Sequence, residues 1–130
     1  ASGPAAALEN MKIIEDEKLL ENTEAMSARL MEGLRELQEH HTAIGDVRGK
    51  GLFCGAELVS NRRTREAADE KMVAAVVRDC MEQGVIIGMT NRSLTGLNNT
   101  LCFSPALISR PDDIDQILSA VDGALGRVFH

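Results

Sequence analysis

Cysteine and histidine side chains supply many of the nucleophiles, bases and metal ligands of enzymes, but here their spacing is unfavourable for such chemistry. The three cysteines are far apart and include no CxxC pair, and none of the three histidines stands at metal-ligand spacing from a cysteine. The sequence therefore predicts no metal site, and it favours reduced thiols in a cytoplasmic protein. These residues are Cys54, Cys80, Cys102, His40, His41 and His130.

Two short segments resemble catalytic or phosphate-binding motifs but lack the context of those motifs. Gly49-Lys50-Gly51 is not spaced as G-x-x-x-x-G-K-[ST], and a strand rather than a helix is expected after it. We interpret it as the turn of a β-hairpin, with glycines that allow positive φ. Ser104 precedes Pro105 with no G-x-S-x-G elbow around it. No residue of the chain is predicted to be catalytic.

Length, charge and composition narrow the class of protein. A chain of 130 residues fits one domain with a modest core. The net charge of −6 and the scarcity of aromatic residues, three Phe only, disfavour nucleic acid as a partner. The acidic balance also disfavours anionic membranes, and the longest apolar run, residues 72–77, is far too short to cross a bilayer. The basic run 62–65 is interpreted as a solvated loop and helix start.

Hydrophobic periodicity predicts three helical regions. Residues 1–41 are expected to be helical with a bend or break near the charged stretch 15–18, where the apolar stripe falls out of step. Residues 67–83 are expected to form a second helix that ends at Gly84 in the left-handed conformation. A last helix is expected after Ser109, which can serve as its N-cap.

The strands expected between these helices define a small sheet. They flank the turn at residues 49–51 and recur at 85–87 and 100–103, with an irregular polar loop over 90–99. The predicted order is α-β-β-α-β-β-α. We expect an α/β fold of the α+β type: a long N-terminal helix, then a mainly antiparallel sheet of three to four strands with helices on one face.

The order of residues in four segments also resembles one family. The hairpin Ile-Gly-Asp-Val-Arg-Gly-Lys-Gly-Leu at 44–52 resembles the start of the small C-terminal domain in class III (ω-amino-acid type) pyridoxal-phosphate (PLP) aminotransferases. The other matching segments are Ala-Ser-Gly-Pro with the Leu-Glu-Asn-Met-Lys-Ile-Ile-Glu helix in 1–15, Gly-Val-Ile-Ile at 84–87 and Leu-Cys-Phe-Ser-Pro-Ala-Leu-Ile at 101–108. The likeness covers nearly the whole chain, in the family's order.

The resemblance implies a division of the chain and a role for each part. Residues 1–41 would be the interdomain long helix region, and residues 42–130 the C-terminal small domain, which closes over the active site and shapes substrate specificity. The parent enzyme would use PLP to transfer an amino group from an amine or ω-amino acid to a 2-oxo acid such as pyruvate. It would be a homodimer in the cytoplasm, and the upstream large domain would be this segment's partner.

The resemblance also implies that the catalytic lysine lies elsewhere. In the family, the lysine that forms a Schiff base with PLP belongs to the large domain. None of the lysines here has its context. The segment alone is therefore expected to bind no PLP and to be inactive. The four lysines are Lys12, Lys18, Lys50 and Lys71.

One residue remains as a candidate for substrate binding. Relatives carry a carboxylate-binding arginine at the position of Cys102 in one branch of the family and at the position of Gly88 in another. This chain has an arginine at neither position, and Arg92 is the basic residue of the intervening loop. The resemblance therefore implies Arg92 as the candidate, in a loop mobile enough by composition to bring it inward. A solvent-facing arginine is the structural alternative.

Two other functions stay open. A PLP-dependent aminomutase or racemase of the same fold would share this part of the chain. A free-standing α/β ligand-binding module without cofactor is also compatible with 130 residues that can form their own core. The natural length of the open reading frame separates the module from the enzyme. The residues of this segment identify neither the amine donor nor the acceptor.

Overall fold

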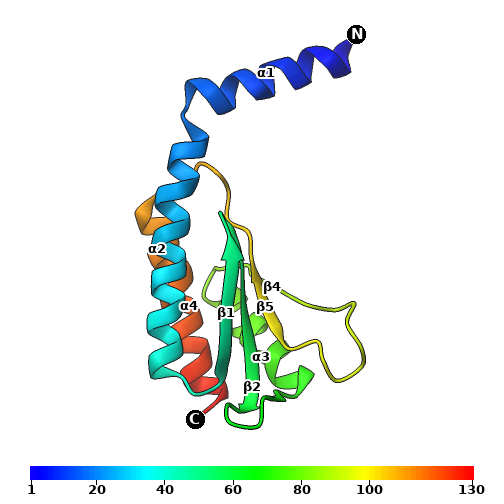
Figure 1. Cartoon of the computed structure of the whole chain (residues 1–130), viewed down its shortest axis with the longest axis vertical. Coiled ribbons are helices and arrows are strands. Elements are labelled where there is room, and N and C mark those ends of the chain that lie inside the picture. Colours follow the sequence, from blue (N-terminus) through cyan, green and yellow to red (C-terminus); the bar gives the residue numbers. More distant parts are fainter.

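Nine helices and strands follow one another in the order α-α-β-β-β-α-β-β-α, and the computed structural model describes all residues from 1 to 130 (Figure 1). They are α1 (Ser2–Asp16), α2 (Leu19–His40), β1 (Ile44–Lys50), β2 (Phe53–Asn61), β3 (Glu66–Ala67), α3 (Glu70–Glu82), β4 (Gly88–Met89), β5 (Thr100–Phe103) and α4 (Pro111–Val128).

The N-terminal helical region is broken where the charged stretch predicted a break. Lys18, between α1 and α2, has a left-handed backbone with φ 50°, so the two helices run in different directions (Figure 1). Helix α1 buries no residue, whereas α2 buries Met26, Leu30 and Leu34 in the core of the chain. The first helix therefore stands apart from the body, and the second is part of it.

The hairpin turn lies one residue later than expected. Lys50 pairs with Phe53 across the β1–β2 ladder, so Gly51 and Leu52 form the turn, and Gly51 has φ +56°. Gly49 does not have a positive φ. It is required for space instead, because a Cβ there would lie 2.7 Å from the Phe53 carbonyl oxygen. The two glycines therefore serve different purposes.

All strand pairs are antiparallel, in the order β1-β2-β5-β4, and β3 pairs with the end of β2. The sheet thus has five strands, since the two-residue β3 was not expected from the sequence. The strand predicted at 85–87 was misplaced: the ladder pairs Gly88 with Cys102 and Met89 with Leu101. Val85 and Ile87 are buried and Ile86 is 84% exposed, so this segment is extended without a strand partner.

Two of the predicted helix starts also moved. Helix α3 begins at Glu70 rather than Ala67, because Asp69 caps it by accepting a hydrogen bond from the Lys71 amide at 2.7 Å. Helix α4 begins at Pro111, which suits a first helical position because it has no N–H to satisfy. Arg110, not Ser109, is its N-cap residue.

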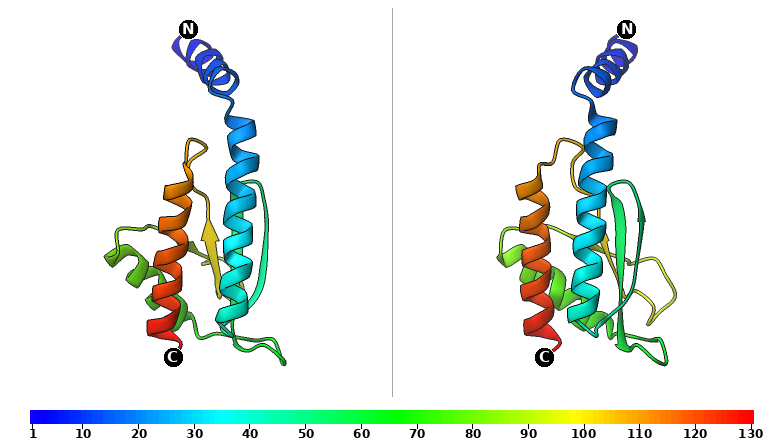
Figure 2. Two further views of the ribbon diagram at one scale, coloured as in Figure 1. Left: turned by 90° about the vertical axis from the view of Figure 1, so that its left-hand side faces the viewer. Right: turned by 60° about the vertical axis from the view of Figure 1, so that its left-hand side comes forward.

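Helices α2, α3 and α4 cover one face of the sheet and leave the other face open, as the two further views show (Figure 2). This agrees with the expected α+β layering. Gly84 ends α3 with φ +82°, the left-handed conformation that was predicted for it. None of the helices is both long and apolar enough to span a bilayer. The buried core includes Leu30, Leu34, Ile44, Leu58, Val73, Val76, Cys80, Leu101, Ile114, Val121 and Leu125.

The hairpin alternates as the sequence predicts, with one exception. Leu52, Cys54 and Ala56 face the helices, while Phe53 lies on the open face and is 71% exposed. Val59 was expected on the same face as Phe53, yet it is only 3% exposed. It packs closely on the backbone of Gly45, where an added Cβ would lie 2.7 Å from Val59 Cγ1.

Candidate functional site

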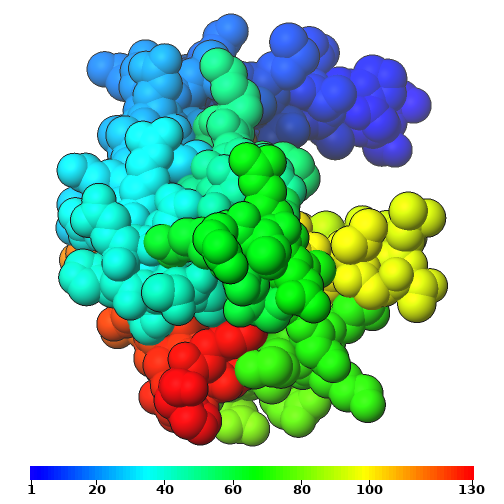
Figure 3. All heavy atoms as spheres, turned by 60° about the horizontal axis from the view of Figure 1, so that its bottom comes forward, coloured from blue at the N-terminus to red at the C-terminus, as the bar shows by residue number.

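The candidate substrate residue Arg92 lies in the segment that joins β4 to β5, which we call the Arg92 loop (residues 90–99). This loop projects away from the body of the molecule, as the yellow segment in the space-filling view shows (Figure 3). The Arg92 side chain is exposed and takes part in none of the ion pairs of the chain. Its guanidinium is therefore available to an external anion.

Hydrogen bonds close the base of the Arg92 loop. The Thr90 amide donates to the Thr100 carbonyl at 2.9 Å, and the Thr100 amide donates to Thr90 Oγ1 at 3.2 Å. On the other side, buried Asn99 exchanges bonds with Leu58 of β2 at 2.6 and 2.7 Å. The ends of the loop are thereby fixed to the central strands of the sheet.

The two positions where the family resemblance implies an arginine meet in space. Gly88 on β4 and Cys102 on β5 are direct partners in the ladder, although they are far apart in the sequence. A Cβ on Gly88 would lie 3.5 Å from the Cβ of Cys102. Side chains from either position would thus project from the same point of the sheet edge, and the Arg92 loop begins just beyond it.

The surroundings of this pair are mostly apolar. Gly88 and Cys102 line a surface depression of about 260 Å³, together with apolar residues that include Ile86, Phe103 and Ile117. Because Leu101 and Phe103 belong to the core, Cys102 lies on the open face of the sheet. The depression therefore offers a mostly apolar surface at the sheet edge, and Arg92 of the adjoining loop is not among the residues that line it.

The hollow beside the hairpin is a different kind of site. It has a volume of about 400 Å³ and is lined by Asp46, Glu57, Arg62 and Arg65 among others. Its carboxylates are already paired, since Arg48 Nη1 donates to Asp46 Oδ2 at 2.8 Å and to Glu57 Oε2 at 2.9 Å. These hydrogen bonds raise the pKa of Arg48. We interpret this hollow as a solvated, structural ion-pair network.

The three cysteines are free, and two of them are buried in the core. Burial raises the pKa of the Cys54 thiol, and burial together with the Asp79 carboxylate raises the pKa of Cys80 to about 11. Both are protonated at neutral pH and act as packing groups rather than nucleophiles. No group of three or more His, Cys, Asp or Glu side chains is arranged to hold a metal ion.

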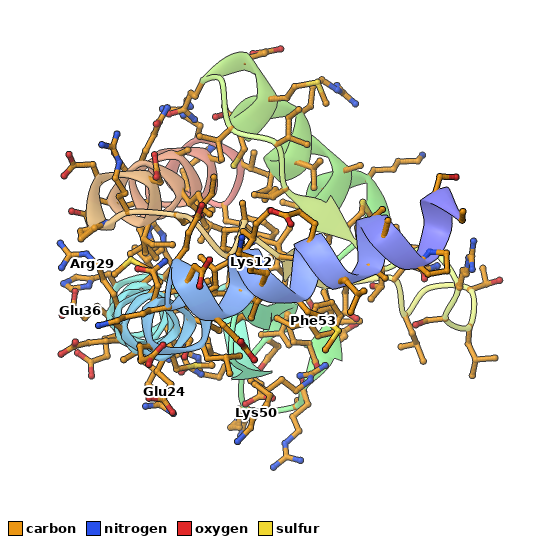
Figure 4. All side chains as sticks on the ribbon, turned by 90° about the horizontal axis from the view of Figure 1, so that it is seen from above. Lys12, Glu24, Arg29, Glu36, Lys50 and Phe53 are labelled. Carbon is orange, nitrogen blue, oxygen red and sulfur yellow. The ribbon has the colours of Figure 1, made fainter.

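The lysines do not form a cofactor site within this segment. All four are exposed, and Figure 4 labels two of them, Lys12 on α1 and Lys50 at the outer end of β1. A lysine that forms a Schiff base at neutral pH is activated by an apolar pocket or by a neighbouring cation. Exposed positions do not provide the apolar pocket, so the residues present here do not fit covalent PLP binding.

Sequence reasoning missed the residues that organise the Arg92 loop from outside. Glu70, the first residue of α3, accepts hydrogen bonds from the loop at Gly96 and Asn98. The sequence shows an acidic residue at a helix start and an Asn-Asn pair in a loop, and both patterns are common for local reasons. Only the folded chain reveals that they are in contact.

Taken together, the fold and the site define a small α/β domain that carries an exposed arginine on the loop between its last two strands. The family model described as aminotransferase class III matches residues 2–125. The chain belongs to the class III aminotransferase family, as the hairpin and the three other segments indicated.

Curated relatives share this chain at high identity but are much longer. The hypotaurine/taurine–pyruvate aminotransferase of Paracoccus denitrificans is 65% identical over 128 residues, which is 98% of this chain and 28% of that protein. The taurine–pyruvate aminotransferase of Rhodobacter capsulatus is 60% identical over 127 residues, with the same coverage. The chain thus spans little more than a quarter of the length of these relatives.

Solved structures agree with this placement. An aminotransferase from Bacillus anthracis superposes with a TM-score of 0.89 at 39% identity, over 93% of this chain and 27% of that one. An amine transaminase from an uncultivated Pseudomonas species, in its PLP-bound form, gives a TM-score of 0.84 at 32% identity, over 95% of this chain and 27% of the other. The α+β fold is therefore one that PLP-dependent aminotransferases contain.

Proposed function

We propose that this chain is a segment of a longer class III aminotransferase that transfers the amino group of taurine or hypotaurine to pyruvate. The observation that carries the proposal is the 65% identity over 128 residues with a relative named for these substrates. In this proposal residues 42–130 form the small domain that shapes substrate specificity. The region 1–41 connects this domain to the remainder of the enzyme.

Arg92 is the proposed anion-binding residue of this segment. Taurine carries a sulfonate, hypotaurine a sulfinate and pyruvate a carboxylate, and a guanidinium can donate two parallel hydrogen bonds to each. Arg92 is exposed and unpaired, and it lies on the loop that directly follows the strand carrying Gly88, which supports this role. One arginine can thus serve both half-reactions, because the amine donor and the acceptor each carry an anionic group.

The cofactor belongs to the proposal for the whole enzyme and not for this segment. PLP supplies the electron sink for amino transfer in this family. Because the lysines here are exposed, the Schiff-base lysine is proposed to lie outside residues 1–130, and the isolated segment is expected to be inactive. What this segment contributes is recognition of the substrate's anionic group and exclusion of water when it closes over the site.

The proposed assembly is a cytoplasmic homodimer in which the large domain contacts this segment. Helix α1 supports a large partner surface, since it buries nothing while Leu8 and Met11 are 68% and 60% exposed. The free, widely separated cysteines support a reducing compartment.

The proposal is tested with the full-length enzyme and its Arg92→Ala variant. Alanine formation from pyruvate with taurine or hypotaurine identifies the reaction, whereas an aminomutase or racemase would convert one substrate without pyruvate. Loss of a charge-assisted pair of about 1.5–3 kcal/mol should lower kcat/KM for taurine and for pyruvate by roughly ten- to a hundredfold. An amine without an anionic group, such as benzylamine, should keep its half-reaction rate.

The matched control is Arg78→Ala, which removes an exposed arginine on α3 that forms no ion pair. It should behave as the unmodified enzyme with every substrate. If Arg92→Ala changed the kinetics equally for substrates with and without an anionic group, the assignment of Arg92 would be refuted and the anion site would lie in another part of the enzyme. Absence of alanine formation with either sulfur-containing amine would refute the proposed reaction.

A further inference from the structure

The far side of the Arg92 loop is held by one carboxylate oxygen. Glu70 Oε1 accepts hydrogen bonds from the Gly96 amide at 2.7 Å, the Asn98 amide at 3.3 Å and the Asn98 Nδ2 group at 3.1 Å. These partners lie 26 and 28 residues away in the sequence. Three donors of a single loop therefore converge on one side chain of α3.

The contact extends from Glu70 to the neighbour of Arg92. Asn98, whose side-chain nitrogen donates to Glu70, uses its Oδ1 atom to accept a hydrogen bond from the Ser93 amide at 2.9 Å. Ser93 directly follows Arg92 in the chain. The backbone position of Arg92 is thus connected to Glu70 through one bridging side chain.

Glu70 suits the positive end of the α3 dipole, but it neither caps this helix nor forms an ion pair. The start of α3 is already capped by Asp69, which accepts from the Lys71 amide. None of the ion pairs of the chain includes Glu70. Its hydrogen-bonding capacity is directed at the Arg92 loop.

Apolar packing does not hold this loop in place. Its two leucines, Leu94 and Leu97, are 75% and 51% exposed. Beyond its hydrogen-bonded base, the conformation of the Arg92 loop is therefore defined by polar contacts such as those of Glu70. A loop of this kind loses its preferred geometry when its main acceptor is removed, because the backbone donors then turn to water.

We propose that Glu70 is a positioning residue for anionic substrates that acts through Arg92. The inference rests on the proposed role of Arg92 as the anion-binding residue. Glu70 fixes residues 96–98 directly, and through Asn98 it also fixes the amide of Ser93. The loop is therefore already ordered before Arg92 binds an anion, so less conformational entropy is lost on binding. Substrate affinity then depends on a carboxylate that itself touches no substrate.

The test measures steady-state kinetics of the full-length enzyme with Glu70→Ala and Glu70→Gln. In Glu70→Ala the KM for pyruvate and for taurine should rise about tenfold, with kcat at saturation within about twofold of the unmodified enzyme. The Glu70→Gln variant keeps a carbonyl oxygen that can accept hydrogen bonds from the loop, so its KM should lie between those of Glu70→Ala and the unmodified enzyme. Benzylamine should show no change in either variant.

A double variant shows whether the effect passes through Arg92. If it does, adding Glu70→Ala to Arg92→Ala should change the KM values no further. Glu66→Ala serves as the matched control, since this exposed glutamate lies on β3 and its side chain takes part in neither the hydrogen bonds that hold the Arg92 loop nor any ion pair. It should leave all constants unchanged.

The outcomes separate this inference from the proposed function. Unchanged KM values in both Glu70 variants, with raised values in Arg92→Ala, would overturn the role of Glu70 and leave that of Arg92 intact. An additional rise in the double variant would also overturn it, because Glu70 would then act independently. Unchanged KM values in Arg92→Ala would refute the proposed site itself. Should Glu70→Ala fail to fold, Glu70→Gln decides the matter.

Discussion

The thiol of Cys80 is fully buried in the core beside α4, and its ionisation is coupled to folding. Burial is the main cause that raises its pKa from about 9 to about 11, and the Asp79 carboxylate adds to the effect. Above pH 9 the unfolded chain loses this proton while the folded chain retains it. The contribution to stability is therefore fully present below pH 9 and is lost as the pH rises towards 11.

This predicts an alkaline loss of stability that depends on one residue. The free energy of unfolding of the native protein, measured by denaturant titration at several pH values, should fall more steeply between pH 9 and 11 than that of Cys80→Ala. A Cys102→Ala variant controls for removal of a thiol, since Cys102 is only partly buried and should leave the steep fall in place. Parallel curves for the native protein and Cys80→Ala would contradict the prediction.

At the scale of elements, the C-terminal end of α2 is stabilised by a residue of the basic run. Arg62 Nη2 donates to the carbonyls of Gln38 at 2.6 Å, His41 at 2.9 Å and Ile44 at 2.7 Å. The carbonyls at the C-terminal end of a helix lack intrahelical donors and carry partial negative charge. A guanidinium there donates hydrogen bonds to them and also supplies a positive charge. The run at 62–65 was expected to be a solvated loop and helix start, but it forms a turn before β3, and its first residue fixes the end of α2.

These hydrogen bonds from Arg62 to the C-terminal end of α2, which cap the helix, should contribute measurably to the stability of the fold. Arg62→Ala is expected to lower the free energy of unfolding by about 1–2 kcal/mol, because the charged donor to the Gln38 and His41 carbonyls at the end of α2 is lost. Thermal or denaturant unfolding measures this. Arg63→Ala is the neighbouring control, since no hydrogen bond of its side chain contributes to the structure and only its backbone donates to Asn61. Equal destabilisation by both substitutions would rule out the cap.

At the scale of the whole molecule, α1 is an apolar surface without a partner in this chain. Leu8, Met11 and Leu20 are 68%, 60% and 71% exposed on and just after this helix, which extends away from the sheet (Figure 1). Covering apolar surface yields about 25 cal/mol per Å². The isolated 130-residue chain should therefore associate with itself through α1.

Sedimentation at increasing concentration tests this expectation. The isolated chain should show a rising average mass, and the double substitution Leu8→Gln with Met11→Gln should shift the association to at least severalfold higher concentration. Glu9→Gln lies between these positions on the same helix and should retain association. A monomer at all concentrations would favour a self-contained module and would weaken the proposal of a large partner domain.

Local features of the molecule were determined by the sequence alone, because neighbouring residues specify them. The break at residues 15–18 follows from a stripe that falls out of step, and the left-handed Gly84 follows from its place after a helical pattern. The hairpin and the strand at 100–103 follow from alternation. Family membership could also be inferred, since it depends on the order of residues rather than on geometry.

Features that depend on distant residues were decided only by the tertiary structure. The strand near residues 85–87 moved to Gly88 because its position is set by pairing with β5, and pairing register is a property of two segments. The same pairing brings Gly88 opposite Cys102. Glu70 and Asn98 are in contact although 28 residues separate them, and the sequence around either residue does not indicate the other as its partner. A periodic pattern fixes which face a side chain occupies, but packing fixes what it meets there.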